Sequence, residues 1–146
     1  MAEGFSYPNG LALTSDQAWL YVADGRSRFV HSFEARPDGS LASGQRFCHL
    51  HLGDDDPDSG ADGLSVDVTG RLYVATRLGL QFCDQAGRVN GIIERPPGRW
   101  LTQAIFGGPG MSALYASSGD AVYRRATKTR GVIPAEVPIK PPQPRL

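Results

Sequence analysis

Two oxygen-bearing side chains occupy equivalent places in an internal repeat of this sequence. Asn9 stands directly before a Gly-Leu-Ala-Leu segment, and Asp62 directly before a Gly-Leu-Ser-Val segment. In a third, weaker copy the same place is held by Thr102. A carboxylate and an amide oxygen that converge suit a hard divalent cation such as Ca²⁺ or Mg²⁺. Asn-Gly and Asp-Gly are also ordinary turn dipeptides, so the chemistry depends on the fold that positions them.

The repeat itself predicts that fold. Each copy continues, after a turn, into a second apolar segment: Leu-Tyr-Val-Ala twice and Leu-Tyr-Ala-Ser once. The copies begin 53 and then 40 residues apart, which is the length of a four-stranded propeller blade. In a propeller, the first residue of each innermost strand lies at the mouth of the central channel. The repeat therefore predicts that Asn9 and Asp62 converge there.

The rest of the sequence favours an all-β chain. It has 18 Gly and 11 Pro among 146 residues, and both residues disfavour helix interiors. Short alternating or apolar runs are separated by turn residues. We predict strands at 11–13, 19–23, 29–33, 46–50, 64–66, 72–75, 80–83, 89–93, 103–106, 113–117 and 121–124.

These strands group into three blades, at about residues 5–52, 61–95 and 100–131, the last of which is one strand short. Residues 132–146 are Pro-rich and are expected to form a tail, packed or loose, with a polyproline ligand as the alternative. Three blades do not close a ring. An open arc leaves two apolar blade faces in water, so we expect either a piece of a larger propeller or a partner across those faces.

Composition excludes several function classes. Fifteen basic and fifteen acidic residues give zero formal charge, so no nucleic-acid partner is expected. No apolar run reaches membrane-spanning length and no export signal is visible at the N-terminus. We therefore expect no membrane partner, and the cytoplasm is the default location. Nucleophile-elbow, Walker A and dinucleotide-binding motifs are absent from the sequence.

The motifs resemble a known family. Tyr-Pro-Asn-Gly-Leu-Ala-Leu at 7–13, Ala-Asp-Gly-Leu-Ser-Val-Asp at 61–67 and Phe-Gly-Gly at 106–108 occur in order, with matching spacing. Together with their Leu-Tyr strands and the closing Lys-Pro-Pro-Gln-Pro-Arg-Leu, they resemble the gluconolactonase, senescence-marker-protein and luciferin-regenerating-enzyme family. The resemblance runs nearly end to end. It implies a partial six-bladed β-propeller, the C-terminal half of the family fold.

The resemblance also implies an activity. Members of this family hydrolyse lactones, and some relatives hydrolyse organophosphates, with one divalent metal in the channel. By position, Asn9 and Asp62 match metal ligands of the family, and Asp62 also matches the proposed base or nucleophile. Thr102 and Gln103 match pocket-lining residues, although the family often has Asn where this chain has Gln103. The implied cofactor is one divalent metal (Ca, Mg, Mn or Zn), and the implied partner is a small-molecule lactone.

The sequence lacks three features of the family pattern. The family's metal-binding Glu comes from its first blade, a substrate-facing Asn from its middle blades, and a ring-closing strand from its N-terminus; none has a counterpart here. One expectation is a lactonase-type hydrolase that is incomplete, and inactive as this chain alone. A second is a homodimer in which two half-propellers complete six blades. A third is a non-catalytic propeller fragment that acts as a binding module.

Other polar residues have simpler interpretations. His49 and His51 precede an acidic loop at 53–58 and could bind a transition metal, but a solvated strand edge is the expected outcome. Asp24 is expected to hydrogen-bond to loop backbone. Cys48 and Cys83 are expected to be buried thiols.

Overall fold

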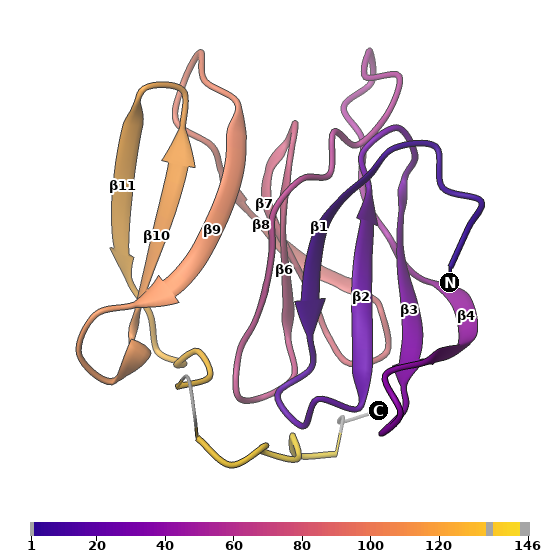
Figure 1. The fold of residues 1–146 in the computed structure, drawn as a ribbon. Coiled ribbons are helices and arrows are strands. Elements are labelled where there is room, and N and C mark those ends of the chain that lie inside the picture. Colours follow the sequence, from indigo (N-terminus) through magenta and orange to yellow (C-terminus); the bar gives the residue numbers. More distant parts are fainter. Residues whose placement is uncertain (1, 134–135, 144–146) are drawn as a thin grey trace.

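The computed structural model describes residues 2–133 and 136–143, which form three antiparallel sheets (Figure 1). The first sheet contains β1 (Pro8–Leu13), β2 (Trp19–Asp24), β3 (Phe29–Ala35) and β4 (Leu41–His49). The second contains β5 (Leu64–Val66), β6 (Leu72–Thr76), β7 (Gly79–Cys83) and β8 (Val89–Glu94). The third contains β9 (Leu101–Gly107), β10 (Ala113–Ser118) and β11 (Ala121–Ala126), with a 3-10 turn, η1 (Pro109–Met111), after β9. No helix in the described ranges is long and apolar enough to cross a membrane.

Each sheet is a simple meander that begins at its innermost strand. The orders are β1-β2-β3-β4, β5-β6-β7-β8 and β9-β10-β11. The first strands β1, β5 and β9 contact one another in that sequence. The sheets therefore radiate from a common line, and the third sheet has one strand fewer than the others. The predicted all-β, partial propeller with an incomplete last blade is confirmed.

One strand is longer than its sequence pattern suggested. β4 begins at Leu41 rather than near Arg46, because residues 41–45 pair with β3 through an irregular register. Ser43 there has a φ of 52°, and the β3–β4 pairing shifts between Ser32 and Glu34. Such a bulge breaks the alternation of apolar and polar residues, which hides this part of the strand from a periodicity analysis.

Two apolar clusters hold the sheets face to face. The cluster between the first and second sheets is built around Val30, Leu72 and Val74, and the cluster between the second and third around Leu80, Phe106 and Leu114. All five residues of β6 are buried, since the second sheet has a neighbour on both faces. Burial of a Val, Leu or Phe side chain stabilises the fold by about 1.5–3 kcal/mol each.

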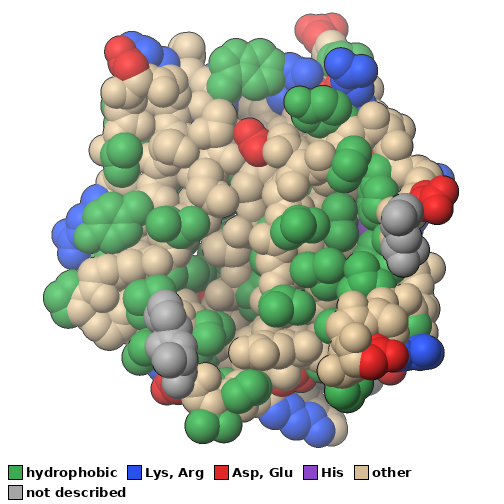
Figure 2. Space-filling model, in the orientation of Figure 1, with side chains coloured by type: hydrophobic (Ala, Val, Ile, Leu, Met, Phe, Trp, Pro, Cys, Tyr) green, Lys and Arg blue, Asp and Glu red, His purple; other side chains and the backbone are tan. Residues whose placement is uncertain are grey.

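The outer faces of the arc are open. On the first sheet, Leu11 is 62% exposed, and on the third, Ile105 is 51% and Val122 is 72% exposed. The Phe5 ring covers part of the first face, where it contacts the rings of His31 and Phe33. On the side shown in Figure 2, charged side chains lie mainly around the rim and hydrophobic side chains occupy much of the middle.

The C-terminal segment crosses the end of the arc opposite to the start of β1 (Figure 1). It leaves the third sheet beside the second, where Gly131 bridges to Asp67. Further on, the Ile139 N–H donates to the Ser15 carbonyl at 2.8 Å, and Gln85 Nε2 donates to the Pro142 carbonyl at 2.6 Å. The described part of the tail is therefore packed against the turns of the first two sheets.

Candidate functional site

The innermost strands bring the predicted site residues to one end of the arc. Asn9 is the second residue of β1, and Asp62 lies two residues before β5. A Cβ atom added to Gly10 would lie 2.0 Å from the Asp62 carbonyl oxygen, so only glycine allows β1 to approach this closely. The Gly63 N–H donates to the Thr102 carbonyl at 2.9 Å. The beginnings of all three innermost strands therefore meet.

The side chains of Asn9 and Asp62 interact. Burial raises the pKa of the Asp62 carboxyl group above its ordinary value, and the nearby amide of Asn9 opposes that shift. Asp62 is half-buried, whereas Asn9 is exposed. The structure thus brings the two oxygen-bearing groups close together, one half-buried and the other exposed to solvent.

Gln103 lies against the same turn, and Thr102 turns toward its own sheet. A Cβ atom added to Gly63 would lie 2.2 Å from Gln103 Oε1, so the amide of Gln103 packs directly against Gly63. Gln103 Oε1 also accepts the Ala104 N–H at 2.9 Å. Thr102 Oγ1 instead bonds to Ser117 Oγ at 2.9 Å. The Gln103 side chain therefore lies against Gly63, and the Thr102 side chain bonds within its own sheet.

A network of hydrogen bonds holds the loop that carries Asp62. Ser59 donates its N–H and its hydroxyl to the Ser27 carbonyl, at 3.0 and 2.7 Å, which ties the loop to the first sheet. The Arg77 N–H donates to the Ser59 carbonyl at 2.9 Å, and Arg77 Nε donates to Asp58 Oδ1 at 2.9 Å. Because turns of two sheets hold this loop, the backbone that leads into Asp62 is held in one position.

Gln81 is a positioning residue that sequence reasoning missed. It is fully buried in β7, where Oε1 accepts the His51 N–H at 2.9 Å and Nε2 donates to the His51 carbonyl at 2.8 Å. Nε2 also donates to Thr76 Oγ1 at 3.1 Å. Gln81 therefore pairs with loop backbone as a neighbouring strand would. A lone amide inside the apolar run Leu-Gln-Phe-Cys was the only signal for it.

The remaining polar candidates have structural roles. Asp24 accepts the backbone N–H groups of Ser6 and Tyr7 at 3.0 and 2.7 Å, which confirms the expected loop hydrogen bonds. His49 Nε2 lies 3.3 Å from Arg28 Nη1, and the backbone of His51 pairs with Gln81. No group of three or more His, Cys, Asp or Glu side chains that could hold a metal occurs among the described residues.

Asn9 and Asp62 offer the type of ligand atom that a hard divalent cation prefers, but fewer ligands than such a cation needs. Both residues offer oxygen, which Ca²⁺ and Mg²⁺ prefer. Ca²⁺ takes about six to eight oxygen ligands, so two side chains provide a fraction of its coordination shell. Asn9 and Asp62 are therefore the residues of this chain that would hold such a cation, together with water or ligands from elsewhere.

Comparisons with known proteins agree with the fold described above. The family model described as SMP-30/Gluconolactonase/LRE-like region matches residues 1–120. A gluconolactonase of Zymomonas mobilis is 30% identical over 132 residues, covering 88% of this chain and 37% of that protein. The structure of a gluconolactonase from Xanthomonas campestris superposes with a TM-score of 0.70 and 28% identity, covering 85% of this chain and 38% of the other.

A more distant structure shares the fold. It is that of a calcium-binding protein, regucalcin, from Agrobacterium tumefaciens, with a TM-score of 0.70, 20% identity, and coverage of 87% of this chain and 48% of the other. Each of these comparisons aligns most of this chain to less than half of its counterpart. The chain therefore spans well under the full length of the proteins that it resembles.

Proposed function

Since the chain belongs to the SMP-30/gluconolactonase/LRE-like family, we propose that it carries part of a metal-dependent lactonase site, centred on Asn9 and Asp62. The observation that supports this most is the close backbone approach of β1 to the turn before β5, which brings Asn9 near Asp62. The substrate class is a sugar lactone or a related ester. This follows from the gluconolactonases among the relatives.

In this proposal Asp62 binds the cation and also moves a proton. A bound divalent cation polarises a lactone carbonyl or lowers the pKa of a water molecule. Burial raises the pKa of Asp62 in the chain without a cation, and a cation bound to the same carboxylate would oppose that shift. As the base, Asp62 would take the proton of the attacking water. Gln103, whose amide lies against Gly63, and Thr102 would contact the lactone. The regucalcin relative is described as calcium-binding, which supports calcium among the candidate cations.

The site of this chain alone is proposed to be incomplete. Two side-chain oxygens do not fill the coordination shell of a cation, and no wall of the described structure faces them across the channel. The open apolar faces, with Leu11 on the first sheet and Ile105 and Val122 on the third, favour burial against further blades. Those blades belong either to a longer polypeptide or to a second copy, which would bring a second Asn9 and Asp62 to the same centre.

Metal-dependent stabilisation tests the site directly. Melting of the chain is followed with and without millimolar Ca²⁺, Mg²⁺, Mn²⁺ or Zn²⁺. A cation at ten times its Kd stabilises the folded state by about 1.4 kcal/mol, or a rise in Tm of several degrees. Asp62→Asn should remove this rise, and Asp55→Asn, in the exposed acidic loop, should keep it. If none of the four metals shifts Tm, the proposed site loses its support.

Oligomeric state separates the two ways of completing the site. Light scattering after size-exclusion chromatography gives the mass of the chain in solution. A dimer whose metal-dependent shift is lost in Asp62→Asn supports the two-copy ring. A monomer without lactonase activity supports a fragment that needs further blades, and a monomer without metal response supports the non-catalytic binding module.

A further inference from the structure

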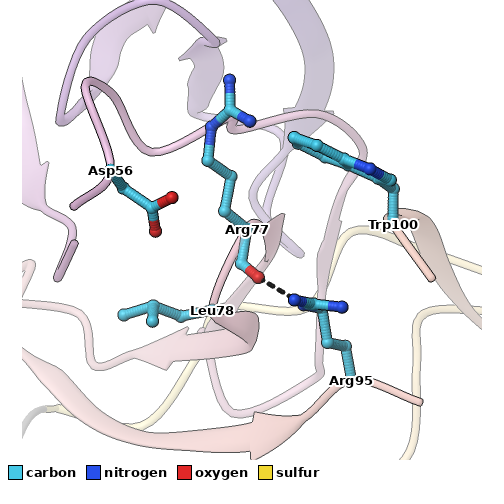
Figure 3. Close-up of a pocket in the computed structure, with 5 residues that line it drawn as sticks. All are labelled: Asp56, Arg77, Leu78, Arg95 and Trp100. Atoms are coloured by element: carbon cyan, nitrogen blue, oxygen red, sulfur yellow. Dashed lines mark hydrogen bonds between the residues drawn. The ribbon is translucent and has the colours of Figure 1, made fainter. Parts of the chain in front are cut away.

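A separate hollow lies at the same end of the arc as Asp62. It has a volume of about 220 Å³ and is lined by Asp56, Arg77, Leu78, Arg95 and Trp100 (Figure 3). These residues come from three loops: the one between β4 and β5, the turn between β6 and β7, and the one between β8 and β9. None of them belongs to the Asn9–Asp62 pair.

The hollow adjoins the loop that carries Asp62. A Cβ atom added to Gly60, two residues before Asp62, would lie 2.7 Å from Arg77 Cγ. Trp100 stands two residues before Thr102, whose carbonyl accepts the Gly63 N–H. The hollow therefore borders the candidate site on its outer side.

Arg95 is held in place without a charged partner. Its Nε donates to the Arg77 carbonyl at 2.7 Å, and its Nη1 donates to the Arg99 carbonyl at 2.8 Å. Within the described part of the chain, no carboxylate lies within 4.0 Å of its guanidinium. Two neutral acceptors thus orient a full positive charge beside the hollow and leave its remaining N–H groups free for an anion.

The other walls supply contacts of three different kinds. Arg77 is paired with Asp58 at 2.9 Å, and its guanidinium carbon lies 4.4 Å from the centroid of the Trp100 ring. Trp100 is 59% exposed, so its ring has surface left for a ligand. Asp56 and Leu78 lie on one side of Arg77, and Arg95 and Trp100 on the other (Figure 3). A carboxylate acceptor, an aromatic ring and an unpaired guanidinium therefore border one small space.

We propose that this hollow binds an anionic sugar, a single sugar unit that bears a carboxylate, sulfonate or phosphate group. The anionic group would accept N–H donors from Arg95, because a guanidinium offers a planar fork to paired oxygens. Hydroxyl groups of the sugar would donate to Asp56, and its C–H surface would lie on the Trp100 ring. The choice of a sugar rests on the proposed function, whereas the anionic requirement rests on Arg95.

Titration with sodium gluconate tests the proposal, with glucose as the neutral comparison and sodium sulfate as the anion alone, all at constant ionic strength. Trp100 reports binding by fluorescence in a Trp19→Phe background, and calorimetry on the unmodified chain repeats the measurement without that change. We expect a saturable response to gluconate that is at least ten-fold weaker for glucose. Arg95→Gln should weaken gluconate binding ten-fold or more. Arg88→Gln, an exposed arginine paired with Asp84 in the β7–β8 turn, should leave it unchanged.

The proposal would be overturned by the absence of a saturable response to gluconate, by equal affinity for glucose, or by full binding to Arg95→Gln. Binding of sulfate as tight as that of gluconate would also overturn it, because the sugar contacts would then add nothing. The metal-dependent Tm shift is measured on Arg95→Gln as well, and it depends on Asn9 and Asp62 rather than on Arg95. Failure of the anionic-sugar site is thereby distinguished from failure of the metal site.

Discussion

The closest backbone approach in the candidate site makes Gly10→Ala the most informative substitution. The new Cβ atom would lie 2.0 Å from the Asp62 carbonyl oxygen, whereas ordinary contacts of a Cβ atom begin at 3.4 Å. β1 and the Asp62 turn would have to separate by about 1.4 Å. Both partners are backbone, so no side chain can rotate away to make room.

The expected cost follows from that displacement. Forcing an extra methyl group into a well-packed interface costs about 1–3 kcal/mol. Replacing glycine also reduces the conformational freedom of the unfolded chain, and this stabilises the folded state by about 0.4–1 kcal/mol. We therefore expect a net loss of about 1–2 kcal/mol, which lowers Tm by roughly 3–8 °C in a domain of this size. The same displacement moves Asn9 away from Asp62, so the metal-dependent shift should weaken as well.

Thermal and urea unfolding of Gly10→Ala measure this effect against Gly107→Ala. At Gly107 the added Cβ atom would meet only the Tyr115 ring, at 3.1 Å, and that ring can move. Gly107→Ala should therefore change Tm by no more than about 2 °C. A Gly10→Ala chain that melts with the wild type, and keeps its metal response, would refute the inferred contact between the inner strands.

Three further predictions concern other parts of the molecule. Gln81→Leu removes three hydrogen bonds from a buried amide. It should lower the free energy of unfolding in urea by about 2–4 kcal/mol and speed proteolysis of the loop at residues 50–60. A loss below about 0.5 kcal/mol would contradict the assigned role. Protonated Asp62 cannot bind a cation, so the metal-dependent Tm shift should fade on acidification. Because burial raises the pKa of this carboxyl group in the chain without metal, the loss at metal concentrations near Kd should begin above the ordinary aspartate pKa of about 3.9. Melting curves at pH 4–7 with and without metal test this. Both cysteines are buried, and the neighbouring Cys48 thiol together with burial raises the pKa of the Cys83 thiol. Neither cysteine should therefore react with a thiol reagent in the native chain, although both should react in urea.

The sequence was sufficient for the parts of the molecule that repeat. The Leu-Tyr motifs and their preceding Gly-Leu segments predicted the inner strands, and their equivalence predicted that Asn9 lies near Asp62. That prediction worked because side chains at equivalent blade positions must converge when the blades share one axis. Equivalent positions in the repeat thus predicted which side chains lie close together in the fold.

The sequence was insufficient where a contact joins segments with no shared pattern. Gln81 and His51 are 30 residues apart, and a buried glutamine in an apolar strand does not say what it will bind. Arg95 and Trp100 lie in a Pro- and Gly-containing loop that has no counterpart of equal length elsewhere in the chain. The first residues of β4 were missed because the bulge near Ser43 removes the alternation.

The crossing of the C-terminal segment affects how the molecule opens. The segment leaves the third sheet, bridges to Asp67 beside the second and bonds to Ser15 of the first. No sheet can therefore detach without breaking contacts to this shared segment, which couples local fluctuations of all three. In hydrogen-exchange experiments the amides of β2, β6 and β10 should consequently open with similar free energies, as a single cooperative unit rather than as a gradient along the arc.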